Sequence, residues 1–399
     1  GEGPPGADPD QRNGVRRLHM KQTSKIISTY SADVFGVCSA LFELGGMTVM
    51  HDASGCNSTY TTHDEPRWYD MESMVYISGL SELEAILGDD EKLICDIVDA
   101  ARDLKPRFIA LAGTPIPAMT GFDYEAAAMV IEERTGIPAF GFATTGMATY
   151  VQGASMALAA FARHFPEEMP KTADRTVNIL GLTPLDFSVN GADKSIADWL
   201  RSRGFRVLSR WAMGSDLEEL KQAGGAHINL VVSAAGLEAA KVLEKRFGTP
   251  YVVGVPYGKD WAETLGDALE LTEEIGLGMQ PHSEPEGGEI VIIGEGVTSV
   301  SLASATEMAT DRGVRVLCPT DCPAEVLRPK DRLCRFEEEL EQALIGAQVV
   351  IADPLMEPIC PKNARFVALP TEAFSGRIYR DDIPNLVTEF DRFLKEASL

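Results

Sequence analysis

Short runs of Val, Ile, Leu and Phe alternate with amphipathic segments from about residue 105 to the C-terminal end. The apolar residues in each run are continuous rather than alternating, which is typical of parallel strands buried on both faces. Intervening segments such as 216–225 and 238–248 have helical spacing and end at Gly, as helices do. This alternation predicts doubly wound α/β domains. The predicted strands are 107–113, 137–143, 176–182, 205–211, 228–234, 250–255, 289–296, 314–319, 347–353 and 364–370.

Two polar stretches that contain proline, 164–175 and 277–289, each precede a new strand. They predict three α/β units. Residues 1–19 are polar and rich in Gly and Pro, and we interpret them as a leader or disordered tail outside the fold. The predicted domains are therefore 20–174, 175–286 and 287–399.

Several loops that follow the predicted strands share Gly, Ser, Thr and Pro. Ligands of parallel sheets bind beyond the carboxyl ends of the strands, so we expect these loops to converge on one inter-domain cleft. The loops are 112–124, 181–191, 233–236, 254–258, 294–299 and 369–377.

The loop 294–299, Gly-Glu-Gly-Val-Thr-Ser, lacks the third glycine of the dinucleotide fingerprint. It is either a tight strand-to-helix turn or a phosphate site at a helix N-terminus. The sequence contains no GxxxxGK[ST] motif, so we expect that the chain does not itself bind and hydrolyse ATP.

The charge balance narrows the class of partner. The 399 residues include 36 Lys and Arg against 60 Asp and Glu, a net charge of −24. A nucleic-acid-binding protein needs a basic surface, so nucleic acid is excluded, and an anionic membrane surface is disfavoured for the same reason. No apolar run reaches the roughly 18 residues of a membrane-spanning helix. Seven cysteines in so long a chain do not make a disulfide scaffold, and we expect a reduced, cytoplasmic setting.

Two N-terminal cysteines, Cys38 and Cys56, are candidate metal ligands. Cys56 lies in a Gly/Ser/Asn loop after a short apolar strand, and thiolates on loops favour iron–sulfur clusters or zinc. A free cysteine can equally be a small buried hydrophobe. His51 opens the same loop, as a proton donor or as a hydrogen-bonded loop histidine.

The remaining cysteines and charged residues are weaker candidates for a functional site. Cys95 falls on the apolar stripe of a helical segment and is expected in the core. Cys318 and Cys322 form C-x3-C, followed by Cys334 and Cys360, either a zinc or cluster site or loop thiols at strand ends. The segment 63–67, which contains two acids and an arginine, is expected to be a solvated face, with a charged substrate-entry loop as the alternative.

Five segments in order and spacing resemble the nitrogenase component 1 family. The first ends in His-Asp-Ala-Ser-Gly-Cys and resembles the family loop that supplies a cluster cysteine. The resemblance implies three Rossmann-like domains around a central cleft. The segments are 36–56, 81–127, 176–187, 238–258 and 372–384.

The resemblance also implies a ligand set. Cys56 keeps its place in the loop, Cys38 precedes it by a family-like interval, and the third cysteine position falls at Thr114 or Pro115. Two thiolates per chain, doubled across a two-fold axis, would satisfy one 4Fe–4S cluster at a subunit interface. The positions that anchor a molybdenum–iron cofactor fall near Ala240 and Tyr379, so that cofactor is not expected.

The function implied by the resemblance is the catalytic, electron-accepting component of a two-component reductase. An iron-protein-like ATP-hydrolysing reductase would be its partner, and a second copy or a paralogous component 1 subunit would complete the cluster site. The substrate would be a small molecule in the cleft, with a tetrapyrrole among the candidates, and His51 would supply protons. A non-enzymatic scaffold for cluster or cofactor assembly and a metal-free binding module remain alternatives.

Overall fold

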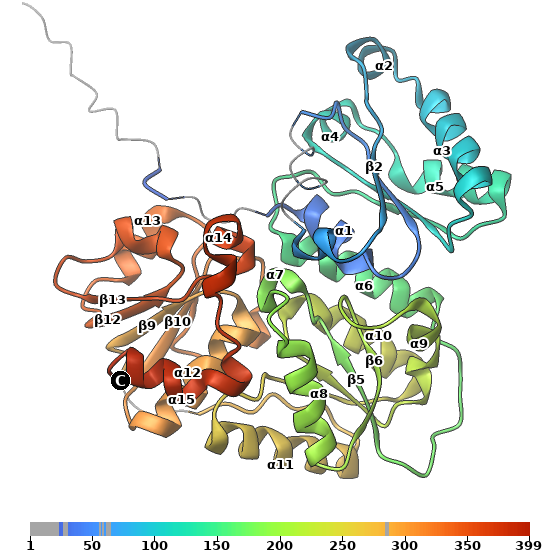
Figure 1. The fold of residues 1–399 in the computed structure, drawn as a ribbon. Coiled ribbons are helices and arrows are strands. Elements are labelled where there is room, and N and C mark those ends of the chain that lie inside the picture. Colours follow the sequence, from blue (N-terminus) through green and yellow to red (C-terminus); the bar gives the residue numbers. More distant parts are fainter. Residues whose placement is uncertain (1–23, 27–30, 56, 58–59, 61–64, 284–286) are drawn as a thin grey trace, which may run out of the picture.

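The computed structural model describes residues 24–26, 31–55, 57, 60, 65–283 and 287–399. Three parallel sheets, each flanked by helices, follow one another along the chain (Figure 1). The predicted α/β fold of parallel sheets is therefore confirmed. Within the described residues, no helix is both long and apolar enough to cross a membrane.

The first sheet has the strand order β2-β1-β3-β4. Several of its helices begin at typical capping residues; Asp89, for example, accepts a hydrogen bond from the Lys92 amide at the start of α3. The elements are α1 (Asp33–Leu41), β1 (Met47–Met50), η4 (Pro66–Tyr69), β2 (Met74–Ile77), α2 (Glu82–Leu87), α3 (Asp90–Leu104), β3 (Ile109–Ala112), α4 (Pro115–Thr120), α5 (Tyr124–Thr135), β4 (Ala139–Phe142) and α6 (Tyr150–His164).

The second sheet repeats this order as β6-β5-β7-β8. Its central strands are fully buried, and the asparagine in each of them is satisfied by a hydrogen bond from Asn178 Nδ2 to Asn229 Oδ1 at 2.8 Å. The elements are β5 (Thr176–Leu180), α7 (Pro184–Phe187), α8 (Ala192–Ser202), β6 (Arg206–Arg210), α9 (Leu217–Lys221), η5 (Gln222–Gly225), β7 (Ile228–Val231), η6 (Ala234–Gly236), α10 (Leu237–Phe247), β8 (Tyr251–Val253) and α11 (Lys259–Ile275).

The third sheet has five strands in the order β11-β10-β9-β12-β13. The two-residue edge strand β11 extends the pattern of the other sheets by one strand. The elements are β9 (Ile290–Ile293), α12 (Gly296–Thr310), β10 (Val314–Cys318), η7 (Ala324–Val326), β11 (Arg332–Leu333), α13 (Glu337–Ala343), β12 (Val349–Ala352), η8 (Pro354–Ile359), β13 (Arg365–Ala368), α14 (Glu372–Tyr379), η9 (Arg380–Asp382) and α15 (Leu386–Glu396).

Each sheet has one topological switch point, where chain order reverses between neighbouring strands. These points lie between β1 and β3, β5 and β7, and β9 and β12. Loops leave such a pair of strands in opposite directions, which opens a crevice at their carboxyl ends. The fold thus offers three crevices, and the question is which of them hold chemistry.

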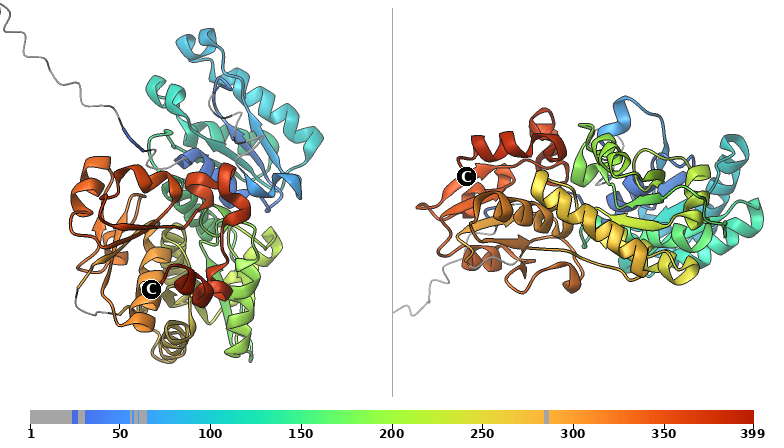
Figure 2. Two further views of the ribbon diagram at one scale, coloured as in Figure 1. Left: turned by 60° about the vertical axis from the view of Figure 1, so that its left-hand side comes forward. Right: turned by 90° about the horizontal axis from the view of Figure 1, so that it is seen from below.

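The second unit contacts both of the others (Figure 2). Helix α6 packs against α1 on one side and α10 on the other. Gly36 and Gly153 permit the first contact, because a Cβ on either would collide with backbone of the facing helix. The second and third units meet through α11 with α12, α14 with α7 and α15 with α8.

Candidate functional site

Five of the six loops singled out in the sequence meet between the second and third sheets. Loops 181–191, 254–258, 294–299 and 369–377 line a cavity of about 70 Å³, together with Tyr150 at the start of α6. Loop 233–236 also belongs to the site, since the Ala234 amide donates a hydrogen bond to the carboxylate of Glu295 in the cavity wall. The expected convergence on an inter-domain cleft is therefore seen, with the switch points of the second and third sheets facing each other.

Asp186 comes from the loop after β5, where α7 begins. Thr183 is the N-cap of α7, and its hydroxyl donates to Asp186 Oδ2 at 2.6 Å while it accepts the Asp186 amide at 3.2 Å. The Tyr150 hydroxyl donates to Asp186 Oδ1. Burial, and then the nearby carboxyl of Glu295, raise the pKa of Asp186 to about 8. Asp186 is therefore largely protonated at neutral pH.

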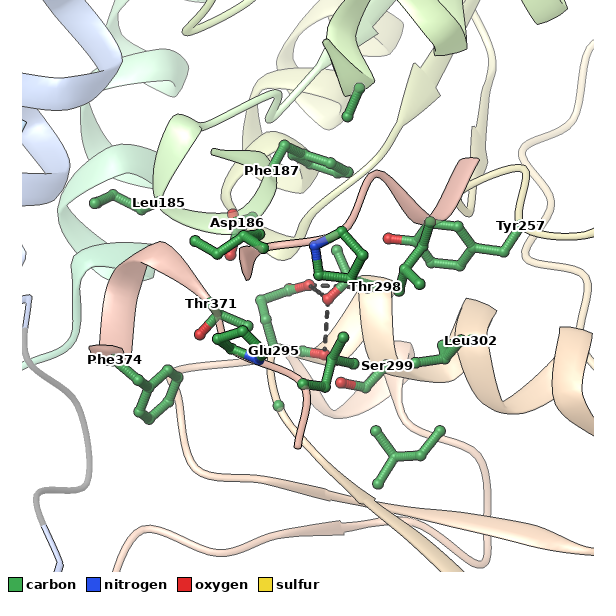
Figure 3. Close-up of a pocket in the computed structure, with 18 of the residues that line it drawn as sticks. Leu185, Asp186, Phe187, Tyr257, Glu295, Thr298, Ser299, Leu302, Thr371 and Phe374 are labelled. Carbon is green, nitrogen blue, oxygen red and sulfur yellow. Dashed lines mark hydrogen bonds between the residues drawn. The ribbon is translucent and has the colours of Figure 1, made fainter. Parts of the chain in front are cut away.

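Glu295 is the N-cap of α12 and lies across the cavity from Asp186 (Figure 3). Its carboxylate accepts the Thr298 amide at 2.9 Å and the Ala234 amide at 2.8 Å, so it joins the start of α12 to the second unit. The Thr298 hydroxyl donates to it at 3.0 Å. Burial raises the pKa of Glu295 above its usual value in spite of these hydrogen bonds.

Two further hydroxyls line the cavity, those of Tyr257 and Ser299. Both residues are 5% exposed, and within the described chain neither hydroxyl has a hydrogen-bond partner. Burial raises the pKa of the Tyr257 phenol, and the carboxyls of Glu295 and Asp186 raise it further, which places the phenol within electrostatic reach of both acids. In Figure 3 the Tyr257 side chain reaches toward Thr298. Most of the remaining wall is apolar, and none of the described lining residues is Lys, Arg or His.

The loop 294–299 is a tight turn rather than a phosphate cradle. A Cβ on Gly294 would lie 2.6 Å from Ser299 Oγ, and one on Gly296 would collide with Cys322 Sγ. Both glycines therefore serve close packing. The Thr298 amide that would bind a phosphate already binds the carboxylate of Glu295.

His51 lies at a different crevice, the switch point of the first sheet, and is not among the residues that line the cavity. Its Nδ1 is 2.9 Å from Ser78 Oγ, and its ring packs 4.6 Å from that of Phe122. Burial lowers the pKa of His51 to about 4, so the ring is neutral at pH 7. Proton donation by His51 stays a prediction.

Beside His51, the oxygen of the Thr114 hydroxyl lies 2.8 Å from the His51 carbonyl oxygen and 3.1 Å from Asp52 Oδ1, and its one hydrogen is shared between these acceptors. Thr114, one of the two positions expected for the missing third cysteine, thus faces the loop that leads to Cys56. The other Asp52 oxygen, Oδ2, is buried without a hydrogen-bond partner among the described residues.

Of the two predicted cluster ligands, only Cys38 lies within the described residues. Cys56 lies outside the described residues. Cys38 lies in α1, is 0% exposed and belongs to the main hydrophobic core. Burial, and then Glu65, raise the pKa of the Cys38 thiol well above its usual value. Ligation by Cys38 stays a prediction, and its burial counts against it.

The described residues do not supply a cluster site by themselves. Among them, no three His, Cys, Asp or Glu side chains gather closely enough to hold a metal ion. A buried thiol at Cys38 and one orphaned oxygen on Asp52 are not a ligand set for iron. A cluster in this protein would therefore need ligands from outside the described residues, and ligation by Cys56 stays a prediction.

Two expectations about polar residues were wrong. Cys95 is exposed rather than in the core, because it lies beside the buried stripe of α3 and receives Arg134 and Glu91 as neighbours. Glu65 and Arg67 do not form a solvated face: they are 0% and 4% exposed and pair with each other at 2.7 Å.

The C-terminal thiols lie near strand ends. Cys318 ends β10 and is buried, with its Sγ 3.4 Å from Thr320 Oγ1, and Cys322 is half-buried. Cys334 is buried beside β11, and Cys360 follows η8. Loop thiols are the interpretation that these positions favour.

Sequence reasoning named the right loops but not the acids in them. Asp186 and Glu295 each follow a buried strand, and Glu295 stands between two glycines, which was the available signal. Tyr150 carried no signal, because it reaches the site from α6 of the first unit.

Comparisons with known proteins agree on one group. The iron-molybdenum cofactor biosynthesis protein NifE of Nostoc sp. is 25% identical over 61% of this chain and 54% of its own length. A subunit of the light-independent protochlorophyllide reductase of Chlorobium luteolum is 33% identical over 32% of this chain and 25% of its own length. The chain spans about half the length of the curated NifE relatives it matches.

A solved structure of nitrogenase Cp1 at pH 6.5 superposes with a TM-score of 0.67 over 96% of this chain and 94% of that chain. At 17% identity this likeness establishes the fold. The family model for nitrogenase component 1 type oxidoreductases matches residues 34–306, more than half of the sequence. The chain belongs to the nitrogenase component 1 type oxidoreductase family.

Proposed function

We propose that this chain is the catalytic, electron-accepting component of a nitrogenase-like two-component reductase. The supporting observation is a cavity at two facing switch points that holds two carboxyls of raised pKa, because a reduction that adds electrons to an organic molecule also consumes protons. Family membership and the similarity to a light-independent protochlorophyllide reductase point the same way. The partner would be an ATP-hydrolysing iron protein, and the second subunit a copy of this chain or a paralogue.

An iron–sulfur cluster, 4Fe–4S by the count of thiolates, would be the electron carrier. Its expected ligand in this chain is Cys56, with Cys38 second. This chain's own residues would bind and orient the substrate and hold protons at Asp186 and Glu295.

The substrate class is constrained by the cavity as it stands. A volume of about 70 Å³ is far below the roughly 300–1,000 Å³ of pockets that take drug-sized ligands. A tetrapyrrole would enter only if the second and third units moved apart.

A second candidate is a non-enzymatic scaffold for cluster or cofactor assembly. The similarity to NifE, a cofactor biosynthesis protein by name, favours it. The two functions differ in turnover: given reductant, a scaffold releases its cluster without converting a substrate.

The cluster is tested by anaerobic purification with measurement of iron content and of the EPR spectrum after reduction. Cys56→Ser should remove most of the iron, whereas Cys95→Ser, at an exposed cysteine on α3, should retain it. Cys38→Ser shows whether the buried thiol takes part. A wild-type protein without iron, or equal iron in Cys56→Ser and Cys95→Ser, would remove the proposed electron carrier.

A further inference from the structure

The cavity between the second and third units contains hydrogen-bonding groups that nothing in the chain uses. The hydroxyls of Tyr257 and Ser299 are each on a residue that is only 5% exposed and line the cavity, and within the described chain neither makes a hydrogen bond. Both hydroxyls border the open space of the cavity, so they are available for hydrogen bonds to a bound molecule.

The acidic groups of the cavity favour one charge for the bound molecule. Two carboxyls, Asp186 and Glu295, face the space, and no described lining residue is basic. An anion would oppose ionisation of either acid and would find no cation in the described wall, which disfavours it. A cation would lower the pKa of both acids and pair with the carboxylates so formed.

The number and kind of ligands argue against a metal ion. Two carboxyls that already accept hydrogen bonds from Thr183, Thr298 and backbone amides fall short of the six to eight oxygens that Ca²⁺ takes. Among the described residues no other His, Cys, Asp or Glu joins them to make a metal site. A primary ammonium group fits better, because it presents three N–H donors and no acceptor.

The size of the cavity and its apolar wall define the rest of the ligand. A volume of about 70 Å³ is small beside the roughly 300–1,000 Å³ of pockets that take drug-sized ligands. Leu302, Phe187 and Leu185 supply apolar surface around the polar groups (Figure 3). A short alkyl group therefore fits, and a long chain or a ring system does not.

We propose that this cavity binds a small organic ammonium ion, a protonated primary amine with a short alkyl group. Its N–H groups would donate to the Glu295 and Asp186 carboxyls and to the free hydroxyl oxygens of Tyr257 and Ser299. This names the charge class of ligand for the cleft of the proposed function. Binding itself requires no electron transfer, so it can hold whether or not the chain is a reductase.

The inference is tested by ligand-observed NMR titration of the full chain with ethylammonium at constant ionic strength. Ethanol serves as the neutral match and acetate as the anionic one. Ethylammonium should bind saturably and at least about tenfold more tightly than ethanol, because hydrogen bonds to charged groups contribute about 1.5–3 kcal/mol. Acetate should not bind.

Variants locate the site. Tyr257→Phe should weaken ethylammonium binding about threefold to tenfold, since it removes one neutral hydrogen bond. Glu295→Gln should weaken it further, and Asp186→Asn provides the same test if the loss of the α12 cap unfolds the first variant. Equal binding of ethanol and ethylammonium, or binding that survives both Tyr257→Phe and Asp186→Asn unchanged, would overturn the proposal. A protein that binds ethylammonium but contains no iron would separate this inference from the proposed reductase.

Discussion

Two junctions between units of this molecule bury acidic side chains. At one junction the acids pair with an arginine, and at the other no described lining residue is basic. Between the first and second units, Arg67 pairs with Glu65 at 2.7 Å and with Glu43 at 2.9 Å. The same guanidinium donates to the Ala212 carbonyl at 2.7 Å, across the junction. Between the second and third units, the carboxyls of Asp186 and Glu295 border a cavity without a basic residue among its described lining.

The difference separates a structural site from a chemical one. At the Arg67 site nearly every polar atom is used within the chain, so the charges stabilise the junction and are closed to ligands. At the cavity, two acids of raised pKa and two hydroxyls without partners leave bonds to be made. A buried charged residue is thus not by itself a sign of function. A buried acid that has no basic partner and borders an open cavity is such a sign.

The largest effect is expected at the compensated junction. Arg67→Met should destabilise the protein by about 3–5 kcal/mol, because it leaves Glu65 buried and without its cation. Denaturant unfolding measures the change. Arg102→Met is the matched control: Arg102 pairs with Asp99 at 2.6 Å on the exposed face of α3, and such surface pairs contribute about 0–1 kcal/mol.

Equal midpoints for these two methionine variants would mean that the Arg67 cluster does not stabilise the junction. A smaller loss in the double variant Arg67→Met with Glu65→Gln than in Arg67→Met alone would identify the unpaired carboxylate as the cause.

The next effect concerns pH and belongs to the cavity. The folded pKa of Asp186, about 8, lies above its ordinary value of 3.8. The protonated carboxyl therefore contributes stability that is fully present below pH 3.8 and is lost as the pH rises to about 8. The free energy of unfolding of the wild type should fall across this window relative to Asp186→Asn, by on the order of 4 kcal/mol between pH 5 and pH 8.

Urea unfolding at several pH values measures this slope. Asp198→Asn is the control, because Asp198 is exposed beside Arg201 on α8 and should leave the wild-type slope unchanged. Parallel curves for the wild type and Asp186→Asn would show that Asp186 titrates as an ordinary carboxyl.

The sequence predicted more of the fold than of the site. All ten predicted strands are present, because a strand of a parallel sheet is rich in apolar residues over a short run that is visible along the chain. The short strands β2 and β11 were missed, since Met74–Ile77 is only partly buried and Arg332–Leu333 is exposed. The loops of the cavity were predicted as a group from their place after strands.

What the sequence could not give is the burial of individual polar groups. The sequence predicted a solvated patch at Glu65 and Arg67. Their burial involves the second unit, where the Ala212 carbonyl accepts a hydrogen bond from Arg67. Cys95 read as core, although a shift of one position around α3 places it outside. Such outcomes depend on packing between units distant in sequence, which local patterns do not encode.

The smallest effect sharpens the contrast between two tyrosines of the cavity wall. Tyr150→Phe removes the hydroxyl that donates to Asp186 and should cost about 1–2 kcal/mol in unfolding free energy. Tyr257→Phe removes a hydroxyl that has no partner in the described chain, so the expected change is within about 0.5 kcal/mol, or a slight gain. Both variants keep the ring and its packing, and calorimetry at pH 6 compares them directly. An equal loss in the two variants would mean that the Tyr257 hydroxyl is already bound, and the cavity would then lose one of the free groups that distinguish it from the Arg67 junction.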